Sequence, residues 1–283
     1  MVKQPVLTHE TVGSAVSDAP DGAADQNSSR RRVFTSRPVL YLASVVIGLG
    51  IWQAAAVLGS TGLLPPPSEV ASVGWEMLVG GELITNAAAS LKRVLLGFVF
   101  GVALAVPSGF LMGWYRWASG MLEPWVQFLR TIPPLALIPL VIVFLGIGEA
   151  AKVFLIFFAA YLATVIGVIQ GVRSVDKTLI DAARVLGAGD ASVFVRVVIP
   201  ATFPYLLVGM RIALGNAWAT LVAAELIAAN SGLGHMMKVA ATYFRVPTVI
   251  VGILTIGALG FAMDRTVLRI DRRLTRWQDK RAV

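Results

Sequence analysis

Few polar side chains interrupt the long apolar stretches of this chain, and those that do are the first candidates for chemistry. Gln127 lies within one helical turn of Arg130, and Asn216 stands four positions before Thr220. Guanidinium, amide and hydroxyl groups can all donate hydrogen bonds, so they suit the binding of a small anion. A charged residue at membrane depth is costly and usually faces a partner or a water-filled cavity. These four residues are therefore candidates for lining a pathway.

Two consecutive prolines, Pro133 and Pro134, follow Arg130 and are candidates for the same pathway. Each proline removes a backbone donor, and helical geometry is disfavoured at the residue before it. In lipid, such a break is tolerated only where protein or a water-filled cavity covers the freed groups. The alternative is a packing kink, with Arg130 at the cytoplasmic end of the span and its head group snorkelling to the interface.

A later apolar stretch carries two stripes of polar residues. Arg211, Trp218 and Glu225 are seven positions apart, whereas Asn216 and Thr220 lie on a different stripe. One stripe lines the pathway and the other packs the bundle or a dimer, and the sequence leaves open which is which. Asn216 and Thr220 could instead form an interhelical hydrogen bond. We predict that Glu225 is a structural charge, since a carboxylate facing an anion would repel it.

The sequence gives little support for catalysis. His9 and His235 stand alone, and the chain has no cysteine. It also lacks the Gly-x-x-x-x-Gly-Lys-Ser/Thr loop that cradles nucleotide phosphates. We therefore predict that the chain is not an enzyme, cannot hydrolyse ATP and has no cofactor or metal of its own. No basic stripe with interleaved aromatics points to nucleic acid as a partner.

Composition indicates that the elements positioning these residues span a membrane. Apolar residues make up 57% of the chain and charged residues only 14%, against about a quarter charged in soluble domains. Spanning a bilayer takes about 20 mostly apolar residues, and six stretches approach that length. They are Val39–Gly59, Val94–Trp114, Thr131–Gly148, Val153–Val172, Phe203–Ala229 and Val246–Met263. The predicted fold is an all-α integral membrane protein of six transmembrane helices.

The domain organisation follows from these stretches. Residues 1–37 are rich in small and polar residues and are predicted to be a disordered cytoplasmic tail. Residues 38–270 form the transmembrane domain, and residues 271–283 form a basic cytoplasmic tail. The first apolar stretch is about twenty residues long, so we interpret it as an uncleaved helix; the alternative is a signal peptide cleaved near Ser60.

Basic residues predict the orientation. With a cytoplasmic N-terminus, the inside segments 1–38, 115–118, 173–202 and 264–283 hold 17 of the 24 Lys and Arg residues. The first outside loop, at about 60–85, has none. This is the positive-inside pattern. It predicts a multi-pass protein of the bacterial cytoplasmic membrane with both termini in the cytoplasm.

The cytoplasmic loop at about 173–202 carries a short amphipathic helix. Its apolar positions at i, i+3, i+4 and i+7 share one face, and they are Leu179, Ala182, Ala183 and Leu186. Because half of that face is alanine, another surface can approach it closely. Gly187 is predicted to stop the helix and Asp190 to cap the next one.

This loop resembles the "EAA" loop of ABC importer permeases. The family pattern appears as Asp181-Ala182-Ala183, Gly187 and Ile199-Pro200, with Asp in place of the usual Glu and Ile in place of Leu. In that family the loop couples ATP hydrolysis on a separate subunit to movement of the substrate. The resemblance therefore implies that these residues, with Leu179 and Leu186, contact an ATPase.

Further motifs in order strengthen this resemblance. They are Leu63–Ser68, Arg130–Leu140, Phe144–Glu149, Trp218–Ile227 and Ser231–Gly234. Together they resemble permeases for nitrate, bicarbonate, taurine and aliphatic sulfonates, most closely the taurine permeases, over about residues 40–280. The resemblance implies a homodimer with two cytoplasmic ATPase subunits, which bind ATP and magnesium, and an outer substrate-binding protein.

The predicted function is thus import of a small anion, with taurine or another sulfonate as the expected cargo. Nitrate, bicarbonate or another small organic solute are the alternative cargoes. A self-contained secondary transporter is the alternative class, although it would usually show an internal repeat, and none is evident here.

Overall fold

The computed structural model describes residues 37–58 and 64–274. No strand occurs in these two ranges. The chain divides into two units, residues 1–58 and residues 59–283, and each is described by itself. Residues 1–36 of the predicted N-terminal tail, including His9, and most of the predicted C-terminal tail lie outside the described residues, whereas Arg37 is the first residue of α2.

The first unit contains α2, and the second contains all of the other helices. In chain order, the elements are α2 (Arg37–Leu58), α3 (Pro67–Val79), α4 (Glu82–Trp114), α5 (Arg116–Leu129), η1 (Pro134–Leu137), α6 (Ile138–Leu145), α7 (Glu149–Arg173), α8 (Lys177–Val185), α9 (Asp190–Val193), η2 (Phe194–Val198), α10 (Ile199–Ala228), α11 (Leu233–Thr242) and α12 (Val246–Leu274).

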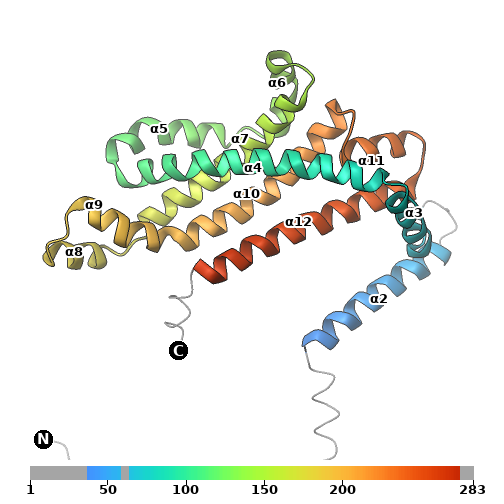
Figure 1. Cartoon of the computed structure of the whole chain (residues 1–283), viewed down its shortest axis with the longest axis horizontal. Helices are drawn as coiled ribbons and strands as arrows, with labels where there is room; N and C mark the ends of the chain where they lie inside the picture. Colours follow the sequence, from blue (N-terminus) through green and yellow to red (C-terminus); the bar gives the residue numbers. More distant parts are fainter. Residues whose placement is uncertain (1–36, 59–63, 275–283) are drawn as a thin grey trace, which may run out of the picture. The chain divides into compact units, whose positions relative to one another are not determined.

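Helices α4, α7, α10 and α12 form the body of the second unit. Helix α7 packs against both α4 and α10, and α12 packs against α10 and α11. Figure 1 shows α8 and α9 at one end of these long helices, and α3 and α11 at the other. We call these the α8 end and the α11 end.

Paired glycines bring α4 and α7 into close contact. Two Gly-x-x-x-Gly motifs, Gly97–Gly101 and Gly109–Gly113, lie on the side of α4 that faces α7. A β-carbon added at Gly109 would lie 2.7 Å from Cβ of Val168, closer than two such atoms approach. Without a hydrophobic drive between helices in lipid, small residues that allow backbone contact are a main source of association.

We expect Gly109→Ala to lower the thermal stability of the purified protein. The new methyl group forces α4 away from α7, and such overpacking typically costs about 1–3 kcal/mol. The control is Gly120→Ala in α5, where an added β-carbon meets nothing within 4 Å. Because alanine favours helix over glycine by about 1 kcal/mol, the control should be neutral or stabilising. Thermal unfolding in detergent measures both variants, and equal melting temperatures would contradict the packing argument.

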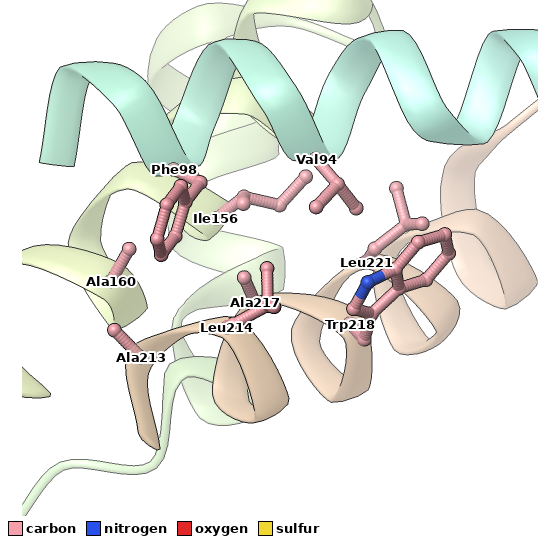
Figure 2. Close-up of a cluster of buried hydrophobic side chains, with 9 residues drawn as sticks. All are labelled: Val94, Phe98, Ile156, Ala160, Ala213, Leu214, Ala217, Trp218 and Leu221. Atoms are coloured by element: carbon pink, nitrogen blue, oxygen red, sulfur yellow. The ribbon is translucent and has the colours of Figure 1, made fainter. Parts of the chain in front are cut away.

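An apolar cluster fills the space between three of these helices. Val94 and Phe98 lie on the side of α4 that faces the other two helices, and Ile156 of α7 and Trp218 and Leu221 of α10 belong to the same cluster, as Figure 2 shows. All five are buried. The cluster fixes how α10 sits against α4 and α7, and α10 carries both predicted polar stripes.

The stretch predicted as a third span, Thr131–Gly148, is not one continuous helix. Helix α5 ends at Leu129, and a bend of 85° separates it from the η1–α6 segment, Pro134–Leu145. Pro133 has an extended backbone at the start of η1. The proline pair therefore causes a full break rather than a kink, because it removes consecutive helical donors.

Within residues 37–58 and 64–274, five helices are long and apolar enough to cross a membrane, and the bent pair makes up to six. The predicted six-span fold is thus approximately supported. Two helices near the α11 end were not predicted, α3 and α11. Their stretches were interpreted as loops because they carry glycines, prolines or charges and are too short to span a bilayer. His235 lies within α11.

Candidate functional site

The first part of the site is α8, and its start is fixed by an N-cap. The Asp176 carboxylate accepts a hydrogen bond of 2.8 Å from the backbone N–H of Thr178. This bond stabilises the charged form, so it lowers the pKa of the Asp176 carboxyl below its ordinary value. A side chain that satisfies an orphan N–H in this way defines where a helix begins.

The end of α8 is fixed by the predicted Gly187. Its φ of +82° is left-handed, its N–H bonds to the Arg184 carbonyl at 2.9 Å, and the Ala188 N–H bonds to the Ala183 carbonyl at 3.0 Å. These two bonds form a Schellman motif. The predicted cap at Asp190 is wrong. Gly189 occupies the N-cap position of α9.

Asp190 is instead the first residue of α9. Its carboxylate accepts a hydrogen bond of 3.1 Å from Arg184. The carboxylate is thus held toward α8 rather than folded over the first N–H groups of its own helix. Ile199 and Pro200 lie in the first turn of α10, inside a continuous helical run from Asp190 to Ala228.

The apolar face of α8 differs from the predicted one. Ile180 and Ala183 pack against a cluster within the chain, whereas Leu186 is 88% exposed and the neighbouring Val185 89%. Leu179 is also exposed. The predicted set is therefore divided. Ala183 anchors α8 to its own chain, and Leu179, Asp181, Ala182 and Leu186 remain accessible to another molecule.

The second part of the site is a cavity of about 750 Å³ between the helix break, α7 and α10. Its lining comprises Arg130, Ile132, Pro134, Leu135, Ala159, Leu162, Ala163, Ile166, Gly167, Gln170, Pro204, Tyr205, Val208, Gly209, Ile212, Asn216, Ala219 and Thr220. Most of these side chains are apolar, and the few polar groups are spread from one end of the lining to the other. A mostly apolar lining with a few polar groups is typical of a pocket for a small solute.

Four of the six predicted pathway residues line the cavity, namely Arg130, Pro134, Asn216 and Thr220. Gln127 and Pro133 are exposed residues that do not line it. Gln127 lies three positions before Arg130, so on a helix of 3.6 residues per turn their side chains are about 60° apart. Pro133 is the residue at which the backbone turns.

Two polar residues of the cavity were missed, Gln170 and Tyr205. Gln170 lies one turn before the end of α7, where an amide is easily taken for an interface residue. It is also the only amide side chain in that helix, and this was the available signal. Among the described residues that line the cavity, Arg130 is the only charged one. A solute there meets a guanidinium, amides and hydroxyls but no carboxylate.

The stripe of Arg211, Trp218 and Glu225 faces away from this cavity. Arg211 donates a hydrogen bond of 2.7 Å to Asp264 of α12. Trp218 and Glu225 are buried at 6% and 0% exposure. The stripe thus packs α10 against its neighbours.

Glu225 has a charged partner that the sequence did not reveal. Arg93 of α4 donates to it at 2.6 Å, and the Ser90 hydroxyl and the Gly234 N–H donate at 2.9 Å. Arg93 immediately precedes the apolar run that starts at Val94. It lies just outside the predicted span and is not among the predicted site residues, although it is only 3% exposed.

Comparison with known proteins agrees with this architecture. Residues 97–276 match the family described as "Binding-protein-dependent transport system inner membrane component". A crystal structure of an amino acid ABC transporter superposes on 72% of this chain and 96% of its own, with a TM-score of 0.55 at 18% identity. At that identity the likeness shows the fold alone.

Relatives align over nearly the whole chain. A "Probable ABC transporter permease protein" of Brucella abortus is 56% identical, covering 85% of this chain and 96% of its own. The taurine transport system permease protein of Escherichia coli is 36% identical, covering 84% and 89%. The bicarbonate transport system permease protein of Synechococcus elongatus is 33% identical, covering 84% and 90%. The chain therefore belongs to the binding-protein-dependent inner membrane components, as a permease subunit of the nitrate, bicarbonate, taurine and sulfonate group of ABC importers.

Proposed function

We propose that this permease subunit imports a small organic or inorganic anion, with taurine or another sulfonate as the expected cargo. The observation that carries the proposal is the charge of the cavity. Arg130 is its only charged lining residue in the part of the chain that the structure describes. A lone cation favours an anion and disfavours a second cation. The taurine and bicarbonate relatives are named for solutes that fit this class.

The few polar groups of the cavity suit transport rather than storage. An ion must bind well enough to enter and weakly enough to leave. Asn216, Thr220, Gln170 and Tyr205 offer neutral donors spread along the lining rather than a closed ring. Selectivity would then rest mainly on a separate binding protein, and the cavity would need only to be compatible with the anion.

We propose that the α8 end faces the cytoplasm and contacts an ATPase subunit. The positive-inside pattern supports this orientation, and Val185 and Leu186 give α8 an exposed apolar tip that a partner could cover. ATP and magnesium would be bound by that partner. Two copies of the permease, each with one ATPase subunit, would form the working assembly.

The α11 end would then face the outside and receive the binding protein. Residues 61–70 and 231–246 lie in this region, except that residues 61–63 fall outside the described residues. Helix α11 and the start of α3 present short helices rather than bare loops. Such short helices at the membrane surface form a firmer docking platform than flexible turns.

The test is uptake by the complex of permease, ATPase and binding protein reconstituted in liposomes. We expect ATP-dependent uptake of labelled taurine that unlabelled sulfonates inhibit. Inhibition by nitrate or bicarbonate instead would assign one of the alternative anions. Uptake without ATP or without the ATPase would contradict the importer assignment in favour of a secondary transporter. Competition only by cations or neutral amino acids would refute an anionic cargo.

A further inference from the structure

The buried Arg93 contacts two separate turns at the α11 end. Its Nε and Nη2 donate to Glu149 at 2.6 and 2.7 Å. Its Nη1 donates to Glu225 at 2.6 Å and to the Ser231 carbonyl at 2.7 Å. Nη2 also donates to the Ser231 hydroxyl at 2.9 Å. A guanidinium has five N–H donors, and all are used. Arg93 has none left for a solute, so its role is to hold the protein together.

One of these turns joins α10 to α11. The backbone N–H groups of Gly232, Leu233 and Gly234 donate to Asn86, Ser90 and Glu225, each at 2.9 Å. Gly232 has a left-handed φ of +111°, and a β-carbon there would overlap the Glu225 carboxylate. Side chains of α4 and α10 thus fix this turn, and it can hardly move while Glu225 stays in place.

The other turn joins α6 to α7 and is held more loosely. It ends at Glu149, the first residue of α7, whose carboxylate also accepts a bond of 2.8 Å from Lys152. The Glu149 side chain is 63% exposed, whereas that of Glu225 is fully buried. Water can solvate the Glu149 carboxylate if it leaves Arg93. Separating Glu225 from Arg93 would instead leave uncompensated buried charges, which is strongly unfavourable.

Both turns continue into elements that line the cavity. Pro134 and Leu135 precede α6, Ala159 and Leu162 lie on α7, and Asn216 and Thr220 lie on α10. Glu225 is five positions beyond Thr220 on the same helix. The contact between the two turns therefore joins the ends of elements that form the cavity walls.

We propose that Arg93 is a positioning residue for transport, which holds the α6–α7 turn against the α10–α11 turn at the α11 end of the cavity. Glu225 is its permanent partner, and Glu149 is the partner released when that end opens. The proposal has a geometric half, that Arg93 holds the two turns together, and a functional half, that Glu149 is released from Arg93 during transport. The functional half rests on the proposed importer function, whereas the geometric half does not.

The geometric half is tested by the distance between spin labels on the two turns. The chain has no cysteine, so Ile147→Cys and Asn230→Cys introduce the only labelling sites. Labelled chains are diluted with unlabelled ones in the complete complex in nanodiscs. We expect a narrow distance distribution for the parent and a broad one for Glu149→Gln. The control Glu76→Gln removes an exposed acid that forms none of the ion pairs among the described residues. It should leave the distribution narrow.

The variant Arg93→Lys distinguishes the ability of Arg93 to bridge the two turns from its positive charge. A lysine keeps the positive charge, but a single ammonium cannot reach two carboxylates and Ser231 in the same geometry. We expect the lysine variant to show the broad distribution as well. Glu225→Gln should reduce the yield of folded protein, since the buried guanidinium loses its charged partner. Parent-like distances in both Glu149→Gln and Arg93→Lys would overturn the geometric half.

The functional half is tested by ATPase activity of the same complexes. We expect Glu149→Gln to raise the activity without binding protein by about fivefold, because the ion pair that favours the resting state is gone. Glu76→Gln should match the parent. If Glu149→Gln broadens the distance distribution but leaves the ATPase activity equal to that of the parent, Arg93 has only a structural role. The functional half is then wrong. A parent complex without any ATP-dependent anion uptake would refute the proposed function. The spin-label distances would still test the geometric half of the proposal.

Discussion

We expect Leu186→Asp to abolish ATP-dependent uptake while leaving the permease folded and inserted. Leu186 is 88% exposed and contributes little to the fold of its own chain. If an ATPase subunit covers it, burying the leucine contributes about 1.5–3 kcal/mol to docking. An unpaired carboxylate in its place adds a desolvation penalty of several kcal/mol. Together these changes should weaken binding of the ATPase by about a hundredfold or more, since 1.4 kcal/mol is tenfold.

Co-purification of the ATPase with the permease measures this directly, and uptake in liposomes measures its consequence. The matched control is Lys177→Asp, about two and a half helical turns before Leu186 and therefore on the opposite side of α8. That variant also introduces an acidic side chain, but at the first helical position, where the helix dipole favours it. If Leu186→Asp retains the ATPase and transports like the parent, α8 is not the docking surface.

The second large effect is expected from the cavity. Arg130→Ala should lower uptake by about tenfold or more, with assembly and ATPase activity retained. A cation a few ångströms from an anion contributes about 4 kcal/mol at the effective dielectric near a protein surface, and losing about a third of that is tenfold. Arg130→Glu should abolish uptake, because a carboxylate repels the anion. Arg130→Lys should restore part of it.

Initial uptake rates at several substrate concentrations distinguish these variants. Arg116→Ala is the charge control, because it removes an exposed arginine at the other end of α5 that does not line the cavity. Gln127→Ala should also transport normally, since Gln127 does not line the cavity either. Equal losses from Arg116→Ala and Arg130→Ala would show that the general charge of α5, rather than the cavity, determines the rate.

Several features of this protein were predictable because they depend on neighbouring residues alone. The apolar stretches predicted the membrane helices, since length and composition decide whether a helix can span a bilayer. Gly187 predicted the end of α8, because a left-handed residue is needed there whatever the helix packs against. The consecutive prolines predicted a break or a kink, as they remove donors from any helix. Their local pattern did not predict its 85° angle.

The helices α3 and α11 were missed for a related reason. They are short and carry glycines or charges, so neither hydropathy nor length distinguished them from loops. The Asp190 cap failed because two local roles competed for one carboxylate. The side chain could cap α9 or pair with Arg184, and only the fold of the loop decided between them.

The sequence by itself determined which long apolar segments are membrane helices, where Gly187 ends α8, and which family the chain resembles. The tertiary structure alone decided which polar stripe of α10 lines the cavity and which side of α8 is exposed. It also paired Arg93 with Glu225, 132 positions apart. The reason is physical. Local rules fix where each helix begins and ends, whereas the rotation of each helix about its axis is set by packing, here by the glycine contacts of α4 and the cluster around Trp218. Only once these rotations are fixed do distant charges meet.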